Sequence, residues 1–342
     1  MGKKILILGN GFDLAFGFWT SYANFVNVRA GKDYSFWPFT EFPDGKYMNE
    51  SLYHHFYNFV QNHKDELGRI RWIDIEGELW NYVNSKKGTP INTELVQEDE
   101  HSYNSLVYQL QTYLSAVYPH RRNRDIDITI PTEILKAIRG NRGFNLIYTF
   151  NYTDPTYILN QFAGYSENEM PKIKYMHGSL KDKNIVLGFN EDLTLPQEYD
   201  FMFKCDKIEP HNLANDLLDA DEIIVYGLSF GQIDGIYFKP FLEQLSSVIS
   251  ANRKPRFSII TYDEQSVKSI QRNMRAMGLS REKMNNGLEF RIIPIHEIEW
   301  DATARNNYNT FLDNLKPMPS IIVGRTPVSY THLRAHETLS DL

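Results

Sequence analysis

The sequence has almost no cysteine, since Cys205 is the only one among 342 residues. A single thiol excludes an internal disulfide and a zinc site that is built on several cysteines. This composition is typical of a protein that works in a reducing compartment, so we expect a cytoplasmic location.

Long apolar runs and an excess of positive charge are also missing. No stretch approaches the roughly 20 apolar residues that a membrane-spanning helix needs. The amino terminus has only four apolar residues after its lysines, too few for a signal peptide. With 36 Lys and Arg against 43 Asp and Glu, the formal net charge is -7. We therefore expect neither a membrane nor nucleic acid in general as a partner.

The carboxyl-terminal end differs in character from the rest of the chain. The run from Val328 to Thr338 resembles the translation of a transposase sequencing adapter. We therefore interpret residues 325–342 as a non-native tail, with the adapter itself starting at about residue 328, and exclude His332 and His336 from any site. The expected domain then covers residues 1–324.

Near the amino terminus, four consecutive apolar residues end in a Gly-x-Gly turn. They predict a short buried strand, which is followed by Gly9, Asn10, Gly11 and Asp13. Glycine lets a backbone approach a ligand closely, and a helix start after such a turn is expected to present unpaired N–H groups to a nucleotide. The third glycine of the dinucleotide motif is absent, because position 14 is Leu14. A plain turn, with Asp13 as a helix-start residue, is the alternative.

Strand and helix patterns alternate through the rest of the chain. Residues 144–150 form an apolar run, as expected for a parallel strand that is covered on both faces. Further strands of the same sheet are predicted at residues 222–226, 257–261 and 290–294. Residues 173–176 and 185–187 could pair as a hairpin. Helical spacing with many aromatic residues predicts a helical insertion at about residues 37–131, after the first strand-helix unit. The expected fold is α/β, with a mostly parallel sheet of the Rossmann type.

Ligands of open parallel sheets bind at the carboxyl ends of the strands, and chemically useful side chains are expected there. Asn151 can orient a ribose hydroxyl or a water, and His177 can act as a general base near neutral pH. Gly227, Ser229 and Asp263 follow two further strands and are candidates for ligand binding. Structural alternatives stay open, because a strand-end asparagine can satisfy backbone groups and a histidine before glycine is often a turn residue.

A serine hydrolase is a second interpretation of the same region. The run from Gly227 to Gly231 matches the Gly-x-Ser-x-Gly nucleophile motif, with Ser229 at its centre. Asp263 and His296 follow in the order Ser, Asp, His that α/β-hydrolases use. This interpretation leaves the amino-terminal glycines without a role, so we rank it second.

Five short blocks along the chain form a combination that is specific even though each block is short. They are Gly9 to Ala15 with Thr20-Ser21-Tyr22, Trp72 to Glu76, Asn151-Tyr152-Thr153, His177-Gly178-Ser179, and Tyr226 to Ser229 with Ile233-Asp234. The combination resembles the AbiH family of bacteriophage abortive-infection proteins and spans residues 3 to about 315. One departure is Trp19, where a proline is more usual in that family.

AbiH proteins are similar in turn to the Sir2-like superfamily, which implies a Sir2-like sheet and NAD as the ligand. In that superfamily an asparagine and a histidine frame the nicotinamide ribose, and this implies catalytic roles for Asn151 and His177. The glycine turn, Gly227 and Ser229 would then contact NAD, with Asp263, or Tyr262 beside it, near the adenosine ribose. The four-cysteine zinc module of deacylase sirtuins cannot exist here. The resemblance therefore favours hydrolysis of NAD to nicotinamide and ADP-ribose, with no metal.

The expected function is antiphage defence by an NAD hydrolase, in which Asn151 holds the ribose or the attacking water and His177 takes the proton. A module that senses a nucleotide without turnover would need the same glycines and stays open. The helical insertion would serve as a lid, an oligomer surface or a sensor, so a homo-oligomer and a phage-derived trigger are expected partners. Asp74 and Glu76 are left out of the site, because acids at a helix start commonly complement the helix dipole.

Overall fold

The computed structural model describes residues 3–27, 36–47, 49–62, 74–120, 123–140, 143–190, 194–204, 212–249, 254–280, 282–283 and 287–315. Trp72, Ile73 and the tail from residue 316 on lie outside these ranges. In the part of the chain that is described, no helix combines the length and the apolar character that crossing a membrane requires.

A six-stranded sheet organises the molecule, in the order β3-β2-β1-β4-β5-β6, and each neighbouring pair is parallel. The strands are β1 (Lys3–Leu8), β2 (Leu146–Thr149), β3 (Lys172–Tyr175), β4 (Ala220–Tyr226), β5 (Arg256–Thr261) and β6 (Glu289–Pro294). The predicted α/β fold with a mostly parallel sheet is confirmed. The strand order reverses between β1 and β4, where sheets of this type form a ligand crevice at the strands' carboxyl ends.

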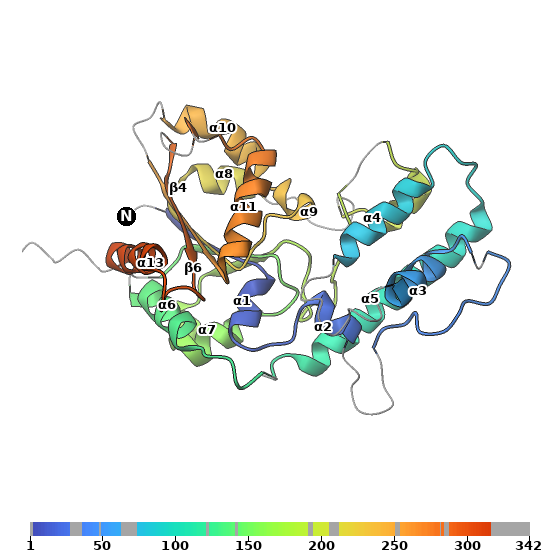
Figure 1. The fold of residues 1–342 in the computed structure, drawn as a ribbon, viewed down its shortest axis with the longest axis horizontal. Coiled ribbons are helices and arrows are strands. Elements are labelled where there is room, and N and C mark those ends of the chain that lie inside the picture. The colour runs from blue at the N-terminus through green and yellow to red at the C-terminus, as the bar shows by residue number, and fades with distance from the viewer. Residues whose placement is uncertain are drawn as a thin grey trace, which may run out of the picture.

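Helices cover both faces of the sheet, because alternate residues of each central strand are apolar on opposite faces. Ile5 and Ile7 of β1 belong to one core cluster, and Leu6 and Leu8 belong to another. The first cluster includes α8 (Leu213–Leu218), α10 (Lys239–Ile249) and α11 (Glu264–Ala276). The second includes α1 (Asn10–Ala15), α6 (Thr129–Gly140), α7 (Thr156–Ala163) and α13 (Ala302–Leu315). Figure 1 shows the two groups of helices on either side of the sheet.

A second body, which we call the helical lobe, stands beside the sheet (Figure 1). Its helices are α2 (Tyr22–Asn27), α3 (Leu52–Asn62), α4 (Ile75–Ser85) and α5 (Thr93–Val117). Its core is aromatic: the ring of Phe56 stacks on Phe39 at 5.2 Å between centroids and meets Trp37 edge-on at 5.5 Å. Many aromatic residues of the predicted insertion are therefore core residues, whereas Phe42 and Tyr108 are exposed.

Side-chain caps explain where several of these helices begin. The carboxylate of Asp74 accepts a hydrogen bond from the backbone N of Gly77 at 2.8 Å and starts α4. Asn92 accepts from the backbone N of Glu94 at 2.9 Å and starts α5. Each cap satisfies a first-turn N–H group that has no partner within the helix.

The predicted hairpin of residues 173–176 with 185–187 is wrong. Strand β3 pairs in parallel with β2, and residues 185–187 form no strand. The cause is tertiary packing, because Ile185 and Leu187 are buried in the core of the helical lobe. The described part of the lobe is thus built from the insertion, from α2 and from residues 185–190 and 194–203, which include the 3-10 helix η2 (Gln197–Met202). At the carboxyl-terminal end of the predicted insertion, near residue 131, helix α6 packs on the sheet and not in the lobe.

Candidate functional site

Three predicted site residues follow the carboxyl ends of neighbouring strands. Leu8 of β1 lies in register with Thr149 of β2, and Thr149 lies in register with Tyr175 of β3. Asn151 and His177 each stand two residues beyond the last paired position of their strands. The sheet therefore brings Gly9, Asn151 and His177 to the same edge, as predicted.

The glycine turn is in contact with the loop after β4. The backbone N–H of Gly9 donates to the carbonyl of Tyr226, and that of Gly11 donates to the carbonyl of Gly227, both at 2.9 Å. A Cβ on Gly227, which has φ +70°, would lie 2.2 Å from the backbone N of Phe12. These two turn N–H groups are therefore paired, contrary to expectation, and close packing of the two loops itself requires glycine.

A buried polar group, which we call the Asp13 cluster, lies beside this turn and consists of Asp13, Asn151 and Thr153. Thr153 Oγ1 donates to Asp13 Oδ2 at 2.5 Å, and Asn151 Nδ2 donates to the carbonyl oxygen of Gly9 at 3.1 Å. The remaining side-chain oxygens, Asp13 Oδ1 and Asn151 Oδ1, are buried and accept no hydrogen bond from the residues that the structure describes. The cluster therefore offers two acceptors to a hydrogen-bond donor.

Burial raises the pKa of Asp13 from its ordinary 3.8 to about 6, although the hydrogen bond from Thr153 and the nearby polar side chains of Thr20 and Asn151 act to lower it. In the unfolded chain the carboxyl regains its ordinary pKa, so the folded protein binds more protons between about pH 4 and pH 6. The stability that this group contributes is complete below about pH 4 and is lost as the pH rises through about 6. A rise of this size corresponds to about 3 kcal/mol.

We expect Asp13→Asn to remove this fall in the free energy of unfolding between about pH 4 and pH 6.5. Urea unfolding at several pH values measures it. Asp125→Asn, at an exposed position, is the control for loss of one carboxylate. A fall of the same size in Asp13→Asn and wild type would show that Asp13 does not titrate in this range.

The second polar group, which we call the His177 cluster, consists of the buried residues His177, Lys204 and Glu76 and of Asp234, whose side chain is 24% exposed. His177 is 3% exposed, and its ring meets that of Phe150 edge-on at 5.5 Å. Its Nε2 lies 3.2 Å from Lys204 Nζ and 3.4 Å from Asp234 Oδ1. Two groups of opposite charge thus approach the same ring nitrogen.

The helical lobe supplies the other half of the His177 cluster. Glu76, in the first turn of α4, pairs with Lys204 at 2.8 Å between Oε1 and Nζ. The same oxygen accepts the backbone N–H of Gly188 at 3.1 Å. Burial raises the pKa of Glu76 and raises that of Asp234 to about 7, while the charge of Lys204 acts to lower both. The cluster is therefore a buried ionic network that joins the two bodies of the molecule.

The fold and the two clusters can now be compared with known families. The model of one family, bacteriophage abortive infection AbiH, matches residues 5–252. The chain belongs to the AbiH family. The matched range contains the glycine turn and both polar clusters, whereas Asp263 and His296 lie beyond it. No curated protein matches the chain.

The His177 cluster of this AbiH chain also has the spacing of a cation site. One ligand atom each from Glu76, His177 and Asp234 lies within 4.8 Å of the others. The ammonium of Lys204 already provides positive charge there, at 2.8 Å from Glu76 Oε1 and 3.2 Å from His177 Nε2. A metal ion could use these three residues only if Lys204 moved away.

The predicted Ser229 triad is not assembled in the AbiH chain. Ser229 is exposed in a loop, and helix α9 (Gln232–Gly235) begins three residues later, so there is no strand-to-helix elbow. The carboxylate of Asp263 caps α11 by accepting from the backbone N of Ser266 at 2.8 Å. Within the described residues, no hydrogen bond joins Ser229, Asp263 and His296. The geometry therefore gives the serine hydrolase no support.

Sequence reasoning missed Glu76, Lys204 and Asp234 as site residues. Two of them were within reach, because Glu76 and Asp234 stand in blocks that resemble the AbiH family. Lys204 gives no signal in the sequence, since it is one lysine beside Cys205 with no motif around it. Asn151 and His177, which were predicted as one catalytic pair, bind different partners in two neighbouring clusters.

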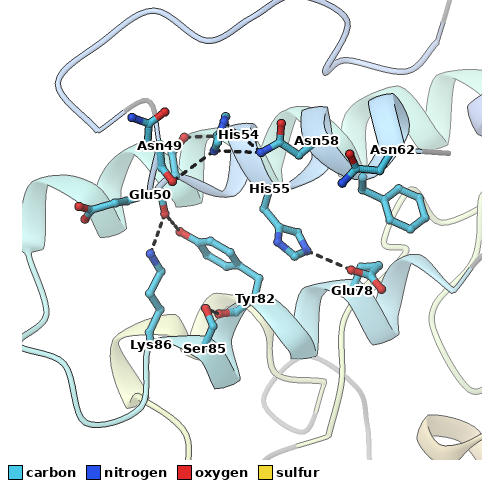
Figure 2. A pocket seen from close by; sticks show the side chains of 12 residues that line it. Asn49, Glu50, His54, His55, Asn58, Asn62, Glu78, Tyr82, Ser85 and Lys86 are labelled. Carbon is cyan, nitrogen blue, oxygen red and sulfur yellow. Dashed lines mark hydrogen bonds and ion pairs between the residues drawn. The ribbon is translucent and has the colours of Figure 1, made fainter. Parts of the chain in front are cut away.

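A groove of about 620 Å³ between α3 and α4 is a separate feature of the helical lobe. Figure 2 shows His55 of α3 and Glu78 of α4 pointing toward each other, at 3.1 Å between Nε2 and Oε2. Tyr82 and Lys86 both donate to the backbone carbonyl of Glu50, at 2.9 and 2.6 Å. The lining contains none of the predicted site residues, so the groove is not the candidate site.

Proposed function

We propose that this AbiH protein binds NAD at the carboxyl edge of its sheet and hydrolyses the bond between nicotinamide and ribose as its step in defence against phage. The observation that carries the proposal is the pair of buried acceptors in the Asp13 cluster, Asp13 Oδ1 and Asn151 Oδ1. A buried acceptor without a donor is costly. Ribose hydroxyls, or a water held beside the ribose, are donors that fit both oxygens.

The residues at this edge suit such a cleavage. As the glycosidic bond breaks, its electron pair leaves with the nicotinamide nitrogen and positive charge develops on the ribose. The carboxylate of Asp13 stabilises that charge, and the neutral amide of Asn151 orients the ribose or the attacking water. The water oxygen bonds to the anomeric carbon, and His177 takes the proton that the water loses. Products are nicotinamide and ADP-ribose.

Other contacts of the ligand follow from the strand ends. Gly227 and Ser229 after β4, and Asp263 after β5, lie along the same edge and stay predictions for the phosphate and adenosine side. Asn10, whose Oδ1 accepts from Thr20 Oγ1 at 2.8 Å, belongs with the glycine turn. A homo-oligomer and a phage-derived trigger that acts through the helical lobe also stay predictions.

The test is consumption of NAD by the purified protein, with and without residues 328–342, together with product analysis. We expect nicotinamide and ADP-ribose from the wild type and no turnover from Asn151→Ala. Asn160→Ala is the matched control, because its amide also donates to a backbone carbonyl, that of Tyr165 at 2.9 Å. Saturable NAD binding without turnover would favour the nucleotide sensor, and absence of both would refute the proposal.

A glycine variant is a poor probe of this binding site. A Cβ on Gly11 would lie 2.8 Å from the Cα of Gly227, so Gly11→Val disturbs the packing of two loops before it affects any ligand. Asn151→Ala introduces no such clash, although it removes the hydrogen bond from Asn151 Nδ2 to the carbonyl of Gly9. A loss of NAD binding without a loss of thermal stability in this variant therefore reports on the ligand rather than on the loops.

A further inference from the structure

The contact with Lys204 restricts where the ring of His177 can carry its proton. An ammonium group has three donors and no acceptor, and Lys204 Nζ lies 3.2 Å from His177 Nε2. The ring nitrogen must therefore be the acceptor, which places the ring proton of a neutral His177 on Nδ1. Glu76, at 2.8 Å, holds Lys204 in this position.

The contact with Asp234 favours the opposite protonation state of Nε2. Its Oδ1 lies 3.4 Å from His177 Nε2 and accepts no hydrogen bond from the described residues. An ionised carboxylate can only accept, so a hydrogen bond to Asp234 requires a proton on Nε2 and leaves the lone pair on Nδ1. Lys204 and Asp234 therefore favour different tautomers of one imidazole.

We propose that Lys204 and Asp234 are positioning residues that compete for Nε2 of His177 and thereby set the tautomer of its ring. While Lys204 stays paired with Glu76, the lone pair of Nε2 is engaged and Nδ1 carries the proton, so neither nitrogen can take another proton. Once Lys204 leaves, the ring loses its Nδ1 proton to solvent and gains one on Nε2, Nε2–H donates a hydrogen bond to Asp234, and the basic lone pair is on Nδ1. The assignment of the tautomer depends only on the distances of Lys204 and Asp234 from Nε2. Its consequence for catalysis rests on the proposed function, in which His177 is the base.

The residues that set the tautomer come from both bodies of the molecule. Glu76 begins α4 of the helical lobe, and Lys204 follows the 3-10 helix η2 of the same lobe. Asp234 lies on α9, in the segment that follows β4. The position of the helical lobe against the sheet therefore decides which neighbour His177 binds, and the base is withheld as long as Glu76 and Lys204 keep their present place.

The tautomer is measurable without any substrate. Nitrogen NMR of the full chain with ¹⁵N-labelled histidine, above pH 7.5, distinguishes protonated from unprotonated ring nitrogens, and His177→Gln assigns the signals. In the wild type we expect a proton on Nδ1 and none on Nε2. In the double variant Glu76→Gln/Lys204→Met, which removes both charges together, we expect the two nitrogens to exchange roles.

Two further variants keep the inference falsifiable. Lys204→Arg retains a donor without an acceptor and should keep the wild-type tautomer. Adding Asp234→Ala to the double variant removes the acceptor and should abolish the preference for Nε2–H. The same tautomer in the wild type and the double variant would overturn the inference, whatever the activity. If the tautomers exchange in a protein that never consumes NAD, the result supports this inference about the tautomer and refutes the proposed NAD hydrolysis.

If NAD is hydrolysed, the double variant gives a second readout. Breaking a hydrogen bond to a charged group typically changes an equilibrium by about 10- to 100-fold. We expect the initial rate of the double variant to rise by that order, because the base no longer has to wait for Lys204 to leave. A double variant with the exchanged tautomer and no gain in rate would show that the wild-type contact does not withhold the base.

Discussion

Replacing His177 by alanine is expected to lower the rate of NAD hydrolysis by about 10²- to 10⁴-fold, the usual contribution of a general acid or base. The physical reason is that the attacking water must lose a proton as its oxygen bonds to the ribose. Two described histidines follow strand ends at this edge and have an ordinary pKa near neutral pH. His177 follows β3, next to the strand that ends at Asn151, whereas His296 follows β6 at the far side of the sheet. Initial rates of nicotinamide release at saturating NAD measure the effect.

His55→Ala is the matched control for this substitution. His55 also belongs to a histidine–carboxylate pair, with Glu78 at 3.1 Å, and lies in the helical lobe outside both polar clusters. Its loss should leave the rate unchanged. Thermal unfolding of both variants shows whether each remains folded at the assay temperature. A folded His177→Ala protein with the wild-type rate would show that another group takes the proton.

Most of the sheet could be predicted from the sequence because its signals are local. A parallel strand that is buried on both faces has a continuous apolar run, and β4 and β5 were located in this way. The glycine turn could also be predicted, since a buried strand that is followed by Gly9 and Gly11 is compatible with few structures other than a tight turn. The hairpin failed because Ile185 and Leu187 have strand-like apolar character, yet they pack on aromatic residues of the helical lobe that are distant in the sequence.

The candidate site was predictable only in part, for the same reason. Asn151 and His177 could be located because each directly follows a strand, and register alone brings them to one edge. The partners of His177 come from three distant segments, at Glu76, Lys204 and Asp234. Their burial and mutual distances depend on how the helical lobe meets the sheet, and no local pattern of charge or hydropathy specifies that contact. A helix-start acid such as Glu76 has an ordinary explanation until Lys204 is seen beside it.

The buried ion pair of Glu76 and Lys204 should show a large difference between single and double substitution. Lys204→Met leaves the carboxylate of Glu76 buried without its cation, and breaking a buried pair in this way typically costs about 3–5 kcal/mol. Glu76→Gln/Lys204→Met removes both charges and should cost much less, because no uncompensated charge remains. The free energy of unfolding in urea, at neutral pH, measures both variants.

The pH dependence of the single variant distinguishes an unpaired carboxylate from lost packing. Burial already raises the pKa of Glu76, and the charge of Lys204 opposes that rise, so the pKa should rise further in Lys204→Met. A carboxyl with a raised pKa in the folded state stabilises the protein when protonated and loses this contribution as the pH increases. The deficit of Lys204→Met relative to the double variant should therefore be small in mildly acidic buffer and grow toward alkaline pH. A deficit that stays constant with pH would mean that Lys204 contributes through packing, and that the ionic network does not hold the helical lobe to the sheet.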